Sequence, residues 1–251
     1  MKKRIAMILV FLLILALAAC APKDAVLDES KKYDISADVH SLDIQINAAD
    51  FIIEHGESFS VESNLKYLTV SEKDGVLTIL DKTEQASDYG DAFLKLRLPE
   101  DTVFQSIEIA TGAARLTADA LSANSLELTL GAGQARFARL NAYSHIEIDG
   151  GAGEITVISG TLNNLTFSLG AGKLDMTAAL LGESEINFGV GESKLTLLGQ
   201  KEDYTLEIEK GLGSITVDGE TLMDSYHSGN GKNHVKIKGG IGAADVTFQG
   251  K

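Results

Sequence analysis

A short glycine motif recurs seven times in the second half of the chain. Each copy follows the template apolar-x-apolar-x-x-Gly-x-small-x-apolar-x-apolar, and the copies begin at Ile107, Leu126, Ile146, Leu165, Ile186, Leu206 and Val235. Successive starts are separated by 19, 20, 19, 21, 20 and 29 residues. Each half of a copy alternates with period two, as a strand with one buried face does. Such a unit cannot bury its own apolar face, so the copies are expected to stack around one continuous core.

The repeat predicts an all-β, single-domain parallel β-helix or β-solenoid, in which each coil of about 20 residues is hydrogen-bonded to the next. The first glycine of each copy is expected to be a structural corner at positive φ, a conformation that glycine reaches without a Cβ clash. The second small residue is expected to lie where a side chain would crowd the neighbouring coil. The seven corner residues are Gly112, Gly131, Gly151, Gly170, Gly191, Gly211 and Gly240.

A glycine loop that holds a phosphate is the alternative interpretation of these motifs. In the stretch FSLGAGKLDM (Phe167 to Met176), the residues after Gly172 alternate like a strand. A nucleotide loop needs a helix after it and usually a third glycine or a Lys-Ser/Thr pair. Because seven equivalent motifs share the strand–corner–strand pattern, the corner interpretation is favoured.

The N-terminal part fits the template less well. A copy from Leu42 carries Asn47 in the glycine place, and asparagine is the next best residue at positive φ. A hairpin is expected to turn near Asp74-Gly75, and a strand from Ala92 is expected to stop near Pro99. Residues 34–105 are therefore expected to form an irregular N-terminal cap that contains a hairpin, and residues 106–251 the regular coils. The long link before the last copy is expected to be a loop or hairpin near the C-terminal end.

The N-terminus has the pattern of a secretory leader. A basic MKKR is followed by the apolar run IAMILVFLLILAL and by LAAC, from Leu17 to Cys20. This end resembles a bacterial lipobox, which implies that residues 1–19 are removed and that Cys20 is lipidated. Residues 20–33 are then expected to be a tether to a domain of residues 34–251. Ordinary signal-peptidase cleavage and a retained membrane anchor remain the alternatives, and the apolar run is short for a membrane span.

The charge of the chain excludes one class of partner. The formal net charge is −14, and without residues 1–19 there remain 19 Lys and Arg against 36 Asp and Glu. Such a chain is repelled by nucleic acid and by anionic headgroups, and no basic patch with interleaved aromatics occurs. Nucleic acid is therefore not expected as a partner. Cys20 is the only cysteine, so a disulfide within the chain is impossible.

These features together resemble a bacterial family described as a putative adhesin domain of unknown function. The resemblance rests on the early hairpin region, on Leu96-Arg97-Leu98-Pro99, on the repeated glycine coils, and on a final motif with Gly240, Gly242 and Val246. It covers about residues 34–250. It implies a single-domain β-helix-like fold in proteins that are often secreted or lipid-anchored, and it implies no catalytic residues.

An outward position in the first strand of successive copies holds three glutamates, which we call the acidic ladder: Glu108, Glu127 and Glu147. The same template position continues with Thr166, Asn187, Glu207 and Lys236. Stacked like charges repel, and a divalent cation such as calcium would relieve the repulsion. A solvated face with splayed side chains is the favoured interpretation, so neither a metal site nor a cofactor is predicted.

Two other groups of residues were candidates for chemistry. His227 and His234, with Asp224, flank the long C-terminal link, but their spacing matches no zinc pattern. Asp149, Asp175 and Glu154 are acidic, but their template positions scatter them, whereas a glycosidase needs a carboxylate pair at a defined separation. No catalytic residue is therefore predicted.

The function expected from the sequence is that of a non-enzymatic, lipid-anchored cell-envelope protein. It would lie on the extracytoplasmic face of the cell membrane and act as an adhesin-like scaffold for an envelope or extracellular protein or glycan. An envelope-stress sensor or accessory protein and a carbohydrate-active enzyme on a β-helix are the alternatives.

Overall fold

The structure is a computed structural model that describes residues 27–36, 38–83 and 90–250. In these ranges the fold is all-β, with one short 3-10 helix, η1 (Lys201–Asp203). The strands are β1 (Leu27–Asp34), β2 (Ser41–Ile46), β3 (Asp50–Gly56), β4 (Ser60–Leu65), β5 (Leu68–Lys73), β6 (Val76–Asp81), β7 (Phe93–Pro99), β8 (Phe104–Thr111), β9 (Arg115–Val157), β10 (Gly160–Asn163), β11 (Leu165–Leu181), β12 (Glu183–Leu198), β13 (Tyr204–Glu209), β14 (Ser214–Val217), β15 (Glu220–Thr221), β16 (Tyr226–Ser228), β17 (Asn233–Lys238) and β18 (Ile241–Gln249).

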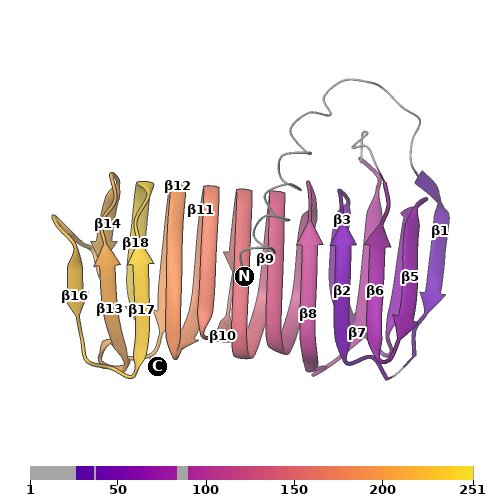
Figure 1. Cartoon of the computed structure of the whole chain (residues 1–251), viewed down its shortest axis with the longest axis horizontal. Coiled ribbons are helices and arrows are strands. Elements are labelled where there is room, and N and C mark those ends of the chain that lie inside the picture. Colours follow the sequence, from indigo (N-terminus) through magenta and orange to yellow (C-terminus); the bar gives the residue numbers. More distant parts are fainter. Residues whose placement is uncertain (1–26, 37, 84–89, 251) are drawn as a thin grey trace, which may run out of the picture.

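Neighbouring repeats in the middle of the chain pair in parallel. Ile107 lies opposite Leu126 in the β8–β9 pair, and β11 runs beside β9 on one side and β12 on the other. Each repeat has a strand before the glycine corner, which we call its first arm, and a strand after the corner, which we call its second arm. Figure 1 shows the arms side by side in an elongated row, with β1 at one end and β16 at the other.

The order of the repeats in space differs from their order in the chain at both ends. The last repeat, β17 and β18, lies between β12 and the strands of the sixth repeat, β13 and β14. At the other end, β2 pairs with both β6 and β8, and β3 pairs with both β7 and β9. The long link before the last repeat is the return path of the chain, because β16 pairs with β13 and β15 with β14 on the outer side.

The outermost strands at both ends pair in antiparallel fashion. The predicted hairpin is present as β5 and β6, and it turns through Asp74 and Gly75 at positive φ. At the C-terminal end the long link, expected as a loop or hairpin, pairs in antiparallel fashion through β15 with β14 and through β16 with β13. The sheet is therefore mixed and not purely parallel. The expected tether also differs from the structure, since residues 27–33 belong to β1, which pairs with β4. These end strands are short or charged, which limits edge-to-edge association.

The fifth repeat begins two residues earlier than the sequence pattern indicated. Phe167 lies opposite Ile186 and Leu169 opposite Phe188, so Ser184, and not Ile186, occupies the first apolar position. The prediction failed because Ser184 is a polar residue at a buried position; it is 5% exposed and its hydroxyl has no hydrogen-bond partner among the described residues. The shift moves Gly191 from the first glycine of its corner to the second.

The glycines form two stacked columns, and the reasons predicted for them are largely reversed. At the first glycine, φ is not positive in any repeat. Instead, a Cβ there would lie too close to the backbone of a neighbouring corner. At Gly170, for example, it would lie 2.6 Å from the carbonyl oxygen of Gly151 in the preceding repeat. Positive φ belongs to the second glycine of five repeats: Gly133, Gly153, Gly172, Gly191 and Gly242. A Cβ at the second glycine would also overlap a backbone carbonyl of the adjacent corner.

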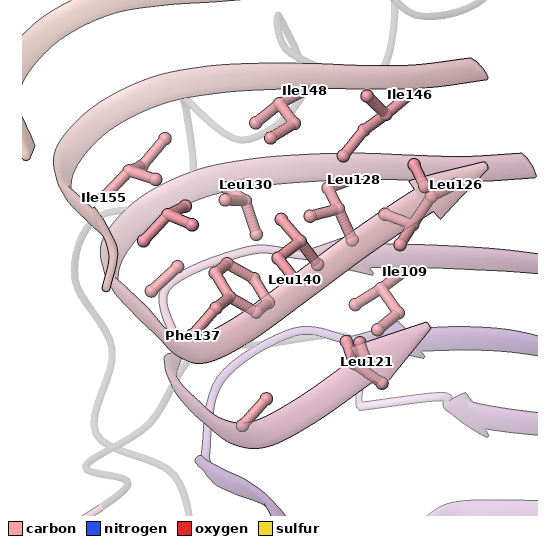
Figure 2. Close-up of a cluster of buried hydrophobic side chains, with 14 of the residues drawn as sticks. Ile109, Leu121, Leu126, Leu128, Leu130, Phe137, Leu140, Ile146, Ile148 and Ile155 are labelled. Atoms are coloured by element: carbon pink, nitrogen blue, oxygen red, sulfur yellow. The ribbon is translucent and has the colours of Figure 1, made fainter. Parts of the chain in front are cut away.

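The core lies between the two arms of each repeat. Figure 2 shows Leu126, Leu128 and Leu130 on one arm, with Phe137 and Leu140 facing them after the chain has turned. All five are buried. The apolar positions of the template therefore point inward, as the alternation predicted. In the described ranges no helix is long and apolar enough to cross a membrane.

Candidate functional site

The first arms present a column of carboxylates on their outer side. Glu108 lies directly opposite Glu127 in the β8–β9 pair, and Glu147 lies opposite Thr166 in the β9–β11 pair. Asp43 of β2 lies opposite Glu108 and extends the acidic ladder by one strand, because β2 is inserted next to β8. Asp43 was not predicted to belong to this column, although the copy that begins at Leu42 has it at the matching position.

Burial and mutual repulsion act on this face together. The pKa of the Glu108 carboxyl is raised, first by burial and then by the charges of Glu127 and Asp43. The pKa of Glu147 is raised by burial and by Asp149 and Glu127, and burial also raises the pKa of Asp149. The folded protein thus holds these protons more tightly than the unfolded chain does.

Removing charge from the acidic ladder should stabilise the protein at neutral pH. A carboxyl with a raised folded-state pKa lowers stability as the pH rises through its ordinary value and then its folded value. We expect the double variant Glu108→Gln, Glu147→Gln to melt a few degrees above the wild type at pH 7. At pH 3 the two proteins should melt alike, since the carboxyls are then protonated. Thermal melts followed by circular dichroism at both pH values measure this.

Glu185 is the matched control for that prediction. It follows Thr166 in the same column, at the place predicted for Asn187, but its pKa is lowered by a hydrogen bond from Lys238. Glu185→Gln should therefore destabilise the protein slightly at pH 7 and not at pH 3. Equal shifts for both variants would contradict the assignment of repulsion to Glu108 and Glu147.

The C-terminal end of the same face is neutralised by ion pairs. Lys236 Nζ of β17 lies 2.8 Å from Glu207 Oε1 and 2.6 Å from Glu209 Oε1 of β13. Lys238 Nζ lies 2.6 Å from Glu185 Oε1 of β12. The inserted repeat thus brings its lysines between two acidic strands. Each exposed pair contributes little stability, but together they leave the middle of the face as its uncompensated acidic part.

The other candidate residues do not assemble into a metal site. Within the described ranges no group of three or more His, Cys, Asp or Glu side chains is arranged to hold a metal ion. His227 of β16 lies opposite Glu207 of β13, and His234 of β17 lies opposite Thr205 of the same strand. Strand β13 therefore separates the two histidines. The acidic ladder forms a line and not a cluster.

The three carboxylates considered for carbohydrate chemistry lie on two different arms and do not form one cluster. Asp149 lies opposite Ser168 on a first arm, and Asp175 lies opposite Thr156 on a second arm. Glu154 follows a corner, where its Oε1 is 3.8 Å from Lys173 Nζ. The structure thus does not bring them together. Cys20 lies outside the described residues.

Comparisons with known proteins give a likeness in fold. No family model and no curated protein matches the sequence. A crystal structure of a putative adhesin from Bacteroides fragilis matches with a TM-score of 0.55 and 11% identity, over 86% of this chain and 95% of that one. A putative adhesin from Parabacteroides distasonis matches with a TM-score of 0.47 and 14% identity, over 88% and 96%. A putative lipid binding protein from the same species matches with a TM-score of 0.39 and 15% identity, over 87% and 96%.

The chain therefore has an all-β fold similar to that of the Bacteroides fragilis protein. At this identity the likeness concerns the fold alone.

Proposed function

We propose that the chain is a non-enzymatic, lipid-anchored protein of the extracytoplasmic face of the cell membrane, with an adhesin-like role. In this proposal residues 1–19 are a lipoprotein signal, Cys20 carries the lipid, and a short tether leads to β1. The partner is an envelope or extracellular protein or glycan that contacts the acidic first arms.

The repeats are inferred to form a β-solenoid that is closed by antiparallel strands at both ends. The parallel register between successive repeats and the two glycine columns support this inference. In such a stack each repeat is held mainly by its neighbours. A rigid, flat outer face follows, on which side chains recur at the inter-strand spacing of about 4.8 Å.

The observation that carries the proposal is the acidic column on the exposed side of the first arms. Asp43, Glu108, Glu127 and Glu147 follow one another without a basic residue between them. The pKa values of Glu108 and Glu147 are raised, first by burial and then by the neighbouring carboxylates. A face of one sign attracts partners of the opposite sign and raises their rate of encounter. The name of the Bacteroides fragilis protein supports the adhesin-like role only by analogy of fold.

Crosslinking on intact cells tests the proposal. A photocrosslinking residue at Glu127 should form adducts with an envelope or extracellular component, whereas one at Lys194, exposed on a second arm, should form few. Cys20→Ala should abolish metabolic labelling with a lipid precursor and lose the adducts at position 127 from the membrane fraction. Equal adducts at both positions would overturn the acidic binding face, and lipid labelling of the Cys20→Ala protein would overturn the anchor.

A further inference from the structure

Four exposed apolar side chains gather at the C-terminal end of the corner edge. Val190, Ile241 and Leu212 are the middle residues of their glycine corners and are 53%, 54% and 89% exposed; Met223 is 80% exposed. They are half of the eight large apolar side chains exposed in the described ranges. We call these four residues the corner patch.

The order of the repeats in space brings the members of the patch together. Val190 lies opposite Ile241 in the β12–β18 pair, and Gly213, next to Leu212, lies against Gly242. Met223 reaches the same corner, because Leu222 N donates to the Ile215 carbonyl at 2.8 Å and Lys210 Nζ donates to the Met223 carbonyl at 3.1 Å.

The patch differs from the rest of the corner edge in size and in charge. The same middle position in the four preceding repeats holds only alanine: Ala113, Ala132, Ala152 and Ala171. The residue after the corner is charged in four of the five earlier repeats, with Lys173 and Glu192 nearest to the patch, but it is Ala243 or Ser214 in the last two repeats. Glu192 and Lys210 therefore border the patch, but no charged residue follows the corner in its last two repeats. A group of exposed apolar side chains of this kind marks a contact surface.

The described chain begins at this same edge. Leu27 of β1 lies opposite Leu65 of β4. Ser63, two residues before Leu65, lies opposite Leu94 of β7. The preceding residue of β7, Phe93, lies opposite Asp50, with which β3 begins after its corner. In Figure 1 the start of β1 lies at the upper edge of the row, and the arrowheads of β2, β8 and β13 point toward this edge. Leu27 is at the N-terminal end of this edge and the corner patch is at the C-terminal end.

Six residues, 21–26, lie between Cys20 and Leu27, and the seven residue-to-residue steps span at most about 25 Å. If Cys20 carries a lipid, as in the proposed function on which this step rests, the corner edge is held close to the bilayer at one end. The apolar patch then faces the same bilayer at the other end.

We propose that the corner patch docks on the lipid surface, so that the row of repeats lies along the membrane on its corner edge. Apolar side chains at the headgroup boundary bind in proportion to the area they bury. The acidic domain is repelled by anionic lipid and by a second copy of itself, so docking relies on apolar contact with a neighbouring zwitterionic or neutral surface. The acidic outer side of the first arms then stays accessible to a partner, because the corner edge and not this side contacts the membrane.

A polarity-sensitive fluorophore on the patch tests this proposal without the natural lipid. Residues 21–251 contain no cysteine. This chain, with Met223→Cys labelled and an N-terminal oligohistidine tag, is tethered to phosphatidylcholine vesicles that contain a small fraction of nickel-chelating lipid. The label should shift its emission to shorter wavelength and be quenched by brominated acyl chains. A label at Glu202→Cys, exposed in η1 at the other end of β13, should change little.

The triple variant Val190→Ala, Leu212→Ala, Ile241→Ala gives three corners the alanine that the earlier repeats have at their middle position. It should abolish the shift at position 223 and leave the circular dichroism spectrum unchanged. A label at 223 that stays in water on tethered vesicles would overturn the proposal. A shift without vesicles that grows with protein concentration would also overturn it, because a second copy would then cover the patch. Since tethering replaces lipidation, these outcomes are independent of the acylation of Cys20.

Discussion

Gly172→Ala is expected to lower the free energy of unfolding by about 3 kcal/mol, because backbone strain and a steric overlap act at one position. Gly172 has φ +139°, which L side chains rarely adopt, and its Cβ would overlap the carbonyl oxygen of Gly153 in the neighbouring corner. Neither conflict can relax locally, since Gly153 and Gly191 are held in the same column by the same geometry. Thermal or urea unfolding followed by circular dichroism measures the loss.

Two neighbouring substitutions separate the causes. Ala171→Val places a larger side chain on the exposed middle of the same corner, as Val190 already does in the next repeat, and should change stability by less than about 0.5 kcal/mol. Gly170→Ala has no positive φ to strain and meets the Gly151 carbonyl oxygen at 2.6 Å, so its cost should lie between the other two. If Gly172→Ala melts like Ala171→Val, the close stacking of the corners is wrong.

Most of the architecture could be predicted from the repeat pattern, because this pattern depends on which side chains are buried. Period-two alternation decides which side chains are buried, and Leu126, Leu128 and Phe137 are inside as it predicted. Its ambiguity appears where one polar residue replaces an apolar one: Ser184 in a buried position makes Ile186 look like the start of the repeat, and the predicted register of that repeat is wrong by two residues.

The spatial order of the repeats was not readable from the template. Every copy offers the same hydrogen-bonding edges, so alternation cannot distinguish the neighbours of one copy from those of another. The 29-residue spacing before Val235 was the available signal, since a link of that length lets the chain pass the sixth repeat and return. Lys236, which meets Glu207 and Glu209, is a charge pattern that favours the inserted position.

The corner patch was visible in the sequence but was not recognised. Val190, Leu212 and Ile241 lie where the other corners have alanine. The template describes only the features that the repeats share, so it does not include this difference. The acidic ladder was found because it repeats, whereas the patch is informative because it departs from the repeat. The strain at the second glycine could not be assigned either, since six of the seven corners have two glycines and the sequence does not show which of them has positive φ.

Phe137→Ala should cost about 3–5 kcal/mol, the range for truncation of a buried aromatic residue in a core that cannot collapse. Phe137 is fully buried between the arms, and Figure 2 shows its ring among Leu128, Leu130 and Leu140. Arg136→Ala, at the exposed neighbouring position, is the control and should cost less than about 0.5 kcal/mol.

The stacking of repeats makes a sharper test of this cavity possible. Ala118 occupies the template position of Phe137 one repeat earlier and is also buried, so the phenyl ring lies next to a small side chain in the stack. Ala118→Leu alone should destabilise by about 1–3 kcal/mol through overpacking. In the Phe137→Ala background the same change should fill part of the cavity and recover stability, giving a favourable coupling between the two sites of about 1–3 kcal/mol. Additive losses in the double-mutant cycle would show that these two side chains do not share one space, and the inferred contact between adjacent repeats would then fail at this level of the core.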